Sequence, residues 1–198
     1  ERDANAMLFE PLQDAAVQAA LTARKETKSL VRIAGCLPPL VASYHSELVP
    51  PKNQAIKSYG RIVEKQASSV DLFIAETMSC VAEVQCVCTA LSETRKPIWI
   101  SFTVKDDDGT LLRSGETLES GIEAAVSGNA DGLLVNCSKP EAVGQSMPIL
   151  SQAGLQYGGM ANSFLSASDL KAGEKVDKLA TRDDLGPTEY ANHAFSWI

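Results

Sequence analysis

The stretch "DGLLVNCSKPEAV", residues 131–143, joins a short apolar run to the pattern of a helix start and places one cysteine between them. Residues 133–135 are typical of a strand that is buried on both faces, as in a parallel sheet. Ser138 and Glu141 have the spacing of a helix capping box. Cys137 is therefore predicted at the carboxyl end of a strand, where backbone N–H groups and the helix dipole attract anions. A cysteine there serves as a nucleophile or a metal ligand, and a packing residue without chemistry is the alternative.

Apolar runs alternate with helical patterns along the whole chain. Strands are predicted at 29–36, 70–78, 97–104, 131–137 and 155–162. Helical spacing is present at 1–25, where Pro11 interrupts the pattern, and at 50–68, 79–94, 117–127, 139–153 and 186–198. Strands that are separated by single helices indicate right-handed βαβ units and hence a parallel sheet.

The repeat of one strand and one helix takes roughly 30 residues, which is typical of an eight-unit TIM barrel of about 250 residues or more. The predicted fold class is therefore α/β, a partial (β/α)8 TIM barrel of about five parallel strands with flanking helices. A doubly wound open sheet is the alternative. Neither GxGxxG nor GxxxxGK[ST] follows a predicted strand, which argues against the common nucleotide-binding forms of that alternative.

The carboxyl ends of parallel strands form one face, so the topology gathers polar side chains from distant parts of the sequence. These side chains are Cys36, Glu76, Thr77, Thr103, Asn136, Cys137 and Asn162. Glu76 follows the apolar run "LFIA" and is interpreted as an anchor for a cationic group or a general base, with a structural ion pair as the alternative. Asn136 either presents its amide to the same space or caps a turn. Cys36 is interpreted as a packing residue.

Other residues that can carry chemistry are interpreted as structural. Residues 106–108, three consecutive aspartates, indicate a charged turn in preference to a divalent metal site. His45 and His193 have no Ser or Cys motif beside them, so a catalytic triad is not expected. The three cysteines of the segment 80–88 match no common zinc spacing and are expected to pack in the core.

A chain of 198 residues is long enough for one substantial core, and its composition is that of an ordinary globular domain. The formal net charge of −7 and the lack of a basic cluster argue against nucleic acid or a membrane surface as a partner. The apolar runs are shorter than the roughly 20 residues of a membrane span, and no secretory leader opens the chain. A cytoplasmic protein of one domain is expected.

Seven stretches resemble the homocysteine S-methyltransferases, zinc-dependent barrel enzymes that move a methyl group onto the sulfur of homocysteine. In family order they are "IAGCLPPLVASYHSEL", "VDLFIAETMSCVAE", "KPIWISFTV", "LRSGE", "GLLVNCSKPEAV", "YGGMANSF" and "LGPTEYANHAFSW". The strand ends "VNCS" and "ETM" carry most of the resemblance. It implies that residues 1–198 form one homocysteine-binding domain that is incomplete at both ends, equivalent to strands three to seven of a larger barrel.

The resemblance also implies a site. Cys137 matches the first of three cysteine thiolates that hold zinc, and the other two are expected beyond residue 198 in a "GGCC" motif. Glu76 matches the glutamate that helps to bind the amino group of homocysteine, and Asn136 is assigned to substrate binding as well. The implied partners are homocysteine and a small methyl donor, with methionine as the product. S-methylmethionine, S-adenosylmethionine, betaine and a methylated folate or corrinoid all remain open as donors, and so do the oligomeric state and any further catalytic residue.

Because only one of the three zinc ligands lies within it, the chain of residues 1–198 alone is expected to be inactive. One alternative is an inactive barrel relative that lacks the complete metal site and serves as an interaction module. Another, a barrel lyase or aldolase that uses a strand-borne lysine, is disfavoured because no lysine lies inside a predicted strand.

Overall fold

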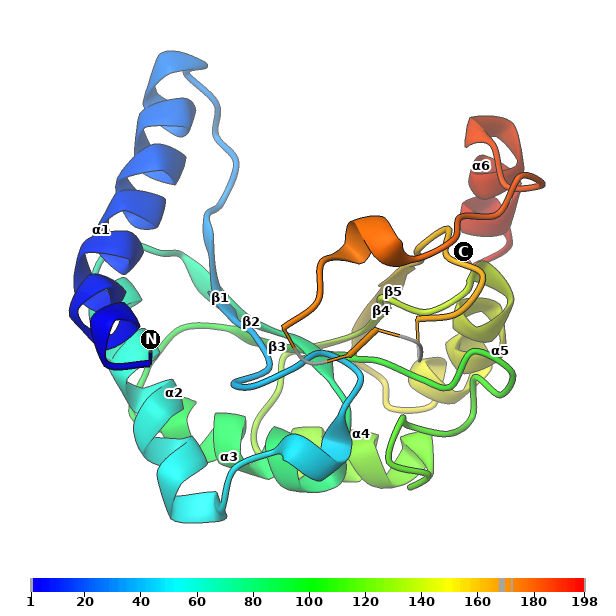
Figure 1. Ribbon diagram of the computed structural model, residues 1–198, viewed down its shortest axis with the longest axis horizontal. Helices are drawn as coiled ribbons and strands as arrows, with labels where there is room; N and C mark the ends of the chain where they lie inside the picture. The colour runs from blue at the N-terminus through cyan, green and yellow to red at the C-terminus, as the bar shows by residue number, and fades with distance from the viewer. Residues whose placement is uncertain (1, 168–169, 172, 198) are drawn as a thin grey trace.

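Five parallel strands form one sheet in the computed structural model, which describes residues 2–167, 170–171 and 173–197 (Figure 1). The strands lie side by side in the order of the sequence. They are β1 (Ala34–Leu37), β2 (Leu72–Met78), β3 (Ile98–Phe102), β4 (Gly132–Asn136) and β5 (Gln156–Met160). All four pairings between them are parallel, so the predicted parallel sheet is confirmed.

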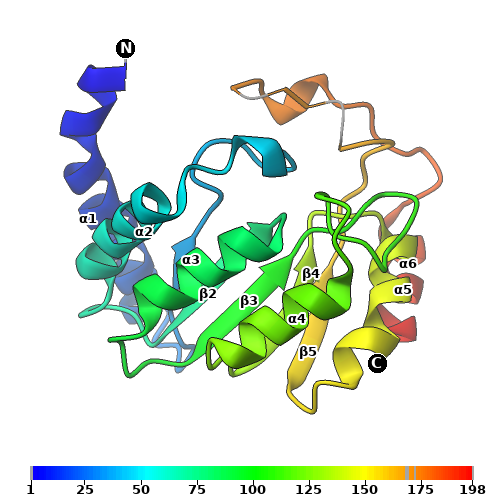
Figure 2. The same ribbon diagram turned by 90° about the horizontal axis from the view of Figure 1, so that it is seen from below.

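The placement of the helices identifies this sheet as an arc of a barrel. Four helices each connect two neighbouring strands and cover the same face of the curved sheet (Figure 2). They are α2 (Lys52–Gln66), α3 (Val81–Leu91), α4 (Leu118–Ser127) and α5 (Pro140–Ser151). A doubly wound sheet would reverse its strand order and carry helices on both faces. The partial (β/α)8 barrel is therefore confirmed over that alternative.

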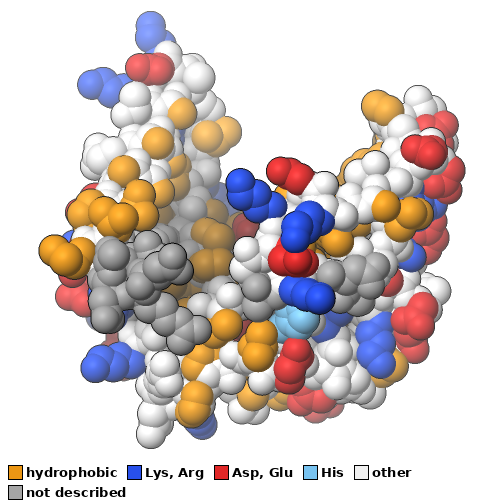
Figure 3. All heavy atoms as spheres, viewed as in Figure 1, with side chains coloured by type: hydrophobic (Ala, Val, Ile, Leu, Met, Phe, Trp, Pro, Cys, Tyr) orange, Lys and Arg blue, Asp and Glu red, His pale blue; other side chains and the backbone are white. Residues whose placement is uncertain are grey.

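Two further helices stand at the sides of the arc. Helix α1 (Arg2–Glu26) packs on α2, and α6 (Pro187–Ser196) packs on α5 (Figure 1). The contact between α1 and α2 includes an ion pair of 3.0 Å between Lys65 Nζ and Glu10 Oε2, and Arg61 stacks on Phe9. Between the α1 side and the α6 side the surface is hollowed, and hydrophobic side chains line part of the hollow (Figure 3). The inner face of the sheet is thus accessible.

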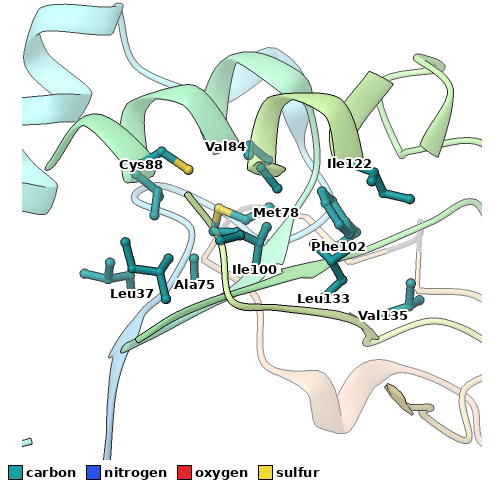
Figure 4. Close-up of a cluster of buried hydrophobic side chains, with 14 of the residues drawn as sticks. Leu37, Ala75, Met78, Val84, Cys88, Ile100, Phe102, Ile122, Leu133 and Val135 are labelled. Atoms are coloured by element: carbon teal, nitrogen blue, oxygen red, sulfur yellow. The ribbon is translucent and has the colours of Figure 1, made fainter. Parts of the chain in front are cut away.

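The core lies between the outer face of the sheet and the helices (Figure 4). Alternate strand residues such as Ala75, Ile100 and Leu133 point outward and are fully buried against helix residues such as Val84. Burial of these apolar side chains contributes roughly 1.5–3 kcal/mol for each large one. The alternation leaves the intervening residues, Glu76 among them, on the accessible inner face.

Two element boundaries differ from the predicted ones. Helix α1 continues through Pro11, whereas the sequence pattern predicted an interruption. Because this part of α1 is exposed, water can hydrate the carbonyl group that the proline leaves without an N–H donor. Strand β1 begins at Ala34, and the preceding apolar residue Leu30 is fully exposed. An apolar run without a neighbouring strand to pair with does not become part of the sheet.

The predicted capping box at the start of α5 was wrong. The residue before the helix is Lys139, and no side chain caps the helix N-terminus. The Ser138 hydroxyl instead accepts a hydrogen bond of 3.0 Å from the backbone N–H of Val104, at the carboxyl end of β3. Glu141 pairs with Arg182. Both side chains have stronger partners in distant segments than the helix terminus offers.

Candidate functional site

A bulge in β2 lies at the carboxyl end of the sheet. Residues 75–78 of β2 span the same length as residues 100–102 of β3, so β2 contains one extra residue. The extra residue falls at Glu76 and Thr77, and Thr77 has a left-handed φ of 62°. This conformation is rare for a β-branched residue. Bulges of this kind change the direction of a side chain next to a site, which here is the side chain of Glu76.

Glu76 borders a cavity of about 250 Å³ on the inner face of the sheet. The other lining residues include Ile74, Ser101, Leu134, Asn136 and Met160, so the wall is mostly apolar with a few polar groups. Such a composition is typical of a small-molecule site. In the part of the chain that the structure describes, no Lys or Arg forms an ion pair with Glu76. The alternative of a structural ion pair therefore has no support there.

Cys36, at the end of β1, contacts the carboxylate of Glu76. Desolvation of the thiol, followed by the negative charge of Glu76, raises the pKa of Cys36 to about 12. The thiol therefore stays protonated at neutral pH and can donate a hydrogen bond to the carboxylate. Packing does not describe Cys36 completely, because its side chain contacts a carboxylate that lines the cavity.

Cys137 follows β4 directly and is half-buried. Its backbone has a left-handed φ of 53°, and its N–H donates to the carbonyl of Met160 at the end of β5. The sulfur is contacted by Asn136 Nδ2 at 3.4 Å, by Thr77 Oγ1 at 3.6 Å and by the side chain of Tyr44. The structure thus brings Cys137 together with the residue that follows Glu76, although about 60 residues separate them in the chain.

Asn136 makes this connection. Its side chain is buried, and its Oδ1 accepts hydrogen bonds from the backbone N–H of Thr77 at 3.0 Å and from Ser101 Oγ at 2.8 Å. Its Nδ2 donates to Thr77 Oγ1 at 2.9 Å as well as to the sulfur of Cys137. One amide therefore joins the carboxyl ends of β2, β3 and β4.

A second wall of the site contains residues that the sequence interpretation missed. Arg113 is buried and donates to Asp106 Oδ1 at 2.8 Å and to the carbonyl of Cys137 at 3.4 Å. The Arg113 guanidinium stacks on the ring of Tyr44, and the distance from Arg113 Cζ to the centre of that ring is 5.1 Å. Burial, followed by the proximity of Cys137, raises the pKa of the Tyr44 phenol. Tyr44 also has a left-handed φ of 72°. Cys137 and two residues that contact it, Thr77 and Tyr44, therefore all have a strained backbone.

The family of the chain follows from a comparison of its sequence with known protein families. Residues 2–198 match the family described as homocysteine S-methyltransferase. The chain belongs to the homocysteine S-methyltransferase family. A comparison with curated protein sequences gave no significant match.

Solved structures similar to this member of the homocysteine S-methyltransferase family include three forms of the homocysteine methyltransferase MmuM from Escherichia coli. The apo form has a TM-score of 0.56 at 17% identity, over 77% of this chain and 69% of that chain. The metallated and oxidised forms have TM-scores of 0.58 and 0.60 at 17% identity, over 77% of this chain and 66% of those chains. The chain thus spans about two thirds of the MmuM structures, and the similarity establishes the barrel fold.

The other residues singled out in this homocysteine S-methyltransferase sequence have structural partners. Asp106 pairs with Arg113, and Asp108 accepts hydrogen bonds from Thr110, which agrees with a charged turn. His45 contacts Glu47 and the carbonyl of Leu170. Asn162 donates its backbone N–H to the Ser138 carbonyl, and Thr103 Oγ1 contacts Ser138 Oγ. The buried cysteines are Cys80, Cys86 and Cys88, in agreement with their predicted packing role, and burial raises the pKa of each thiol.

Two absences apply to the described ranges 2–167, 170–171 and 173–197. No group of three or more His, Cys, Asp or Glu side chains there is arranged to hold a metal ion. No helix there combines the length and the apolar character that are needed to cross a bilayer.

Proposed function

We propose that this protein, in its complete form, transfers a methyl group from a small activated donor to the sulfur of homocysteine and so produces methionine. The observation that carries the proposal is the junction of two strand ends, in which Asn136 and Thr77 join Glu76 to Cys137. A carboxylate that lines the cavity and a thiol that is joined to the cavity wall through Asn136 suit a substrate that has both an ammonium group and a thiol. Membership of the homocysteine S-methyltransferase family supports the same reaction.

Glu76 is proposed to bind the ammonium group of homocysteine. Its carboxylate lies against a mostly apolar wall, where a charge-assisted hydrogen bond is stronger than in water. Asn136 borders the same cavity and is the second residue that we assign to the homocysteine site. The domain that binds homocysteine comprises residues 1–198 together with further strands of the barrel.

Cys137 fits one ligand position of a zinc site. Its sulfur contacts Asn136, which lines the cavity, and is oriented by two side chains, as metal ligands usually are. We propose that two further cysteine ligands lie beyond residue 198, and the match to the homocysteine S-methyltransferase family supports this. Zinc bound by three thiolates would keep one position open and stabilise the thiolate form of homocysteine at neutral pH. The contribution of this chain is to place Cys137 and to hold the amino group of the substrate.

The experiment compares zinc content and methionine formation in the complete protein and in its Cys137→Ser variant. We expect one zinc per complete wild-type protein, and loss of most of the zinc and nearly all methyl transfer in the variant. Cys86→Ser is the matched control, because it makes the same substitution at a buried cysteine of α3 that does not line the cavity. Stoichiometric zinc and full activity in Cys137→Ser would refute the assignment of Cys137.

The same measurement tests the alternative of an inactive relative that acts as an interaction module. That alternative predicts that the complete wild-type protein holds no zinc and forms no methionine with any donor. Trials with S-methylmethionine, S-adenosylmethionine, betaine and a methylated folate would identify the donor. A cytoplasmic location is part of the proposal, and fractionation of cells that express the complete protein tests it.

A further inference from the structure

The buried amide of Asn136 has used its whole hydrogen-bonding capacity within the protein. A side-chain amide has two N–H donors and one oxygen that accepts twice. Its oxygen accepts from the Thr77 backbone N–H and from Ser101, and its nitrogen donates to Thr77 Oγ1 and to the Cys137 sulfur. A substrate could bond to Asn136 only by displacing one of these partners. The amide is therefore arranged to hold protein groups in place.

The orientation of this amide is fixed by chemistry. A backbone N–H can only donate, so the atom of Asn136 that faces the Thr77 N–H must be the oxygen. The nitrogen must then face Thr77 Oγ1 and the sulfur of Cys137. Thr77 Oγ1 accepts a hydrogen bond from this nitrogen and donates its own hydroxyl hydrogen to the sulfur. These two donors help to define the direction of the sulfur.

The same amide also fixes the backbone beside Glu76. Thr77 is the left-handed residue of the β2 bulge, in a conformation that costs about 1–3 kcal/mol for a residue of this type. Its N–H, which belongs to the peptide group that follows Glu76, is held by Asn136 Oδ1. If this hydrogen bond were lost, the bulge could relax and the Glu76 side chain would change direction.

We propose that Asn136 and Thr77 form a positioning pair that sets the separation between the Glu76 carboxylate and the Cys137 sulfur. This separation selects the length of the thiol amino acid, so that homocysteine binds in preference to cysteine, which is one methylene shorter. The inference rests on the proposed function, because it takes Glu76 and Cys137 as the two ends of the homocysteine site. A single methylene is a difference that binding sites distinguish by about 10- to 200-fold.

The experiment uses Thr77→Val in the complete zinc-loaded enzyme. Valine keeps the β-branched shape and the backbone, and it removes only the hydroxyl that joins Asn136 to the sulfur. We measure the KM for homocysteine, the Ki of cysteine as a competitor, and zinc affinity by competition with a chelator. We expect the KM for homocysteine to rise about tenfold. The ratio of the Ki of cysteine to this KM should fall about tenfold, and the affinity for zinc should fall by about 10- to 100-fold.

Two further variants make the result specific. Thr77→Ser keeps the hydroxyl and should restore all three quantities. Thr94→Val is the matched control, since the Thr94 hydroxyl bonds to the Leu91 carbonyl at the end of α3, away from the site. Partial unfolding would lower total activity and leave the ratio of Ki to KM unchanged. An active Thr77→Val enzyme with an unchanged ratio and unchanged zinc affinity would overturn the positioning proposal alone, whereas a wild-type enzyme that does not methylate homocysteine would overturn the proposed function and this inference together.

Discussion

A buried carboxylate below the site allows a test of how the β2–α3 turn is stabilised. Glu83, in α3, is 1% exposed, and its Oε2 accepts hydrogen bonds from the backbone N–H and the hydroxyl of Ser79. Its Oε1 accepts from the Tyr59 hydroxyl at 3.1 Å. Desolvation by burial raises the pKa of Glu83 above its usual value of 4.5. These contacts hold the turn that begins directly after the bulge.

We expect Glu83→Gln to become progressively more stable than the wild type as the pH rises above about 4.5. Because the pKa of Glu83 is raised in the folded state, the folded protein binds this proton more tightly than the unfolded protein does. Stability is therefore lost as the pH rises from the unfolded pKa through the folded one. Glutamine can accept from Ser79, donate to the Tyr59 oxygen and avoid the buried charge. Each unit by which the pKa is raised corresponds to about 1.4 kcal/mol of difference at high pH.

The assay is urea denaturation of the complete protein at several values between about pH 5 and pH 8, where ordinary carboxyl groups are already ionised. Glu93→Gln, at an exposed position just after α3, is the control and should differ from the wild type by a constant amount. Glu83→Ala should lower the free energy of unfolding by about 3–5 kcal/mol, since it removes a buried methylene and the carboxyl group and leaves the Ser79 N–H without its acceptor. A difference between Glu83→Gln and the wild type that stays flat or falls with pH would refute the reasoning.

Three further outcomes are expected. Glu76→Gln should raise the KM for homocysteine by about ten- to a hundredfold, because a charge-assisted hydrogen bond of roughly 1.5–3 kcal/mol is lost; an unchanged KM would show that the carboxylate is structural. A polypeptide of residues 1–198 expressed alone should self-associate in sedimentation, because β1 and β5 have open edges and Leu30 and Phe195 are exposed; a cooperative monomer would contradict this. The hydrogen bond to the Leu170 carbonyl raises the pKa of His45, so protonation of His45 contributes stability that is present below an unfolded pKa of 6.5 and is lost as the pH rises through the folded value; proteolytic cleavage between Leu170 and Lys171 should therefore become faster toward alkaline pH in the wild type than in His45→Gln.

The sequence predicts the order of strands and helices because that order depends on local periodicity. Short apolar runs such as "LFIA" and "GLLV" that alternate with helical patterns are expected to form buried strands. All five predicted strands are present in the structure. The predicted strand at 29–36 was too long, because its first residues have no neighbour to pair with. Local pattern cannot show whether a partner is available.

The positions of Glu76 and Cys137 at strand ends could be predicted for the same reason. The hydrogen bonds that connect the two strand ends could not be predicted, because they join residues that are about 60 positions apart in the sequence. No propensity rule places a bulge after "LFIA" or predicts that Arg113 and Tyr44 flank Cys137. Ser138 illustrates the limit, since its pattern fits a helix cap and its hydroxyl bonds to β3 instead.

The left-handed residues at the two strand ends explain both why local rules miss the site and why these side chains are present. Glycine adopts positive φ without steric penalty, whereas Thr77 and Cys137 each retain about 1–3 kcal/mol of strain. Glycine at either position would relax the backbone and remove the hydroxyl or the sulfur. Asn136 offsets part of this strain by holding the Thr77 N–H. Since the backbone alone would favour glycine at both positions, the presence of the threonine hydroxyl and the cysteine thiol agrees with the roles that we propose for them.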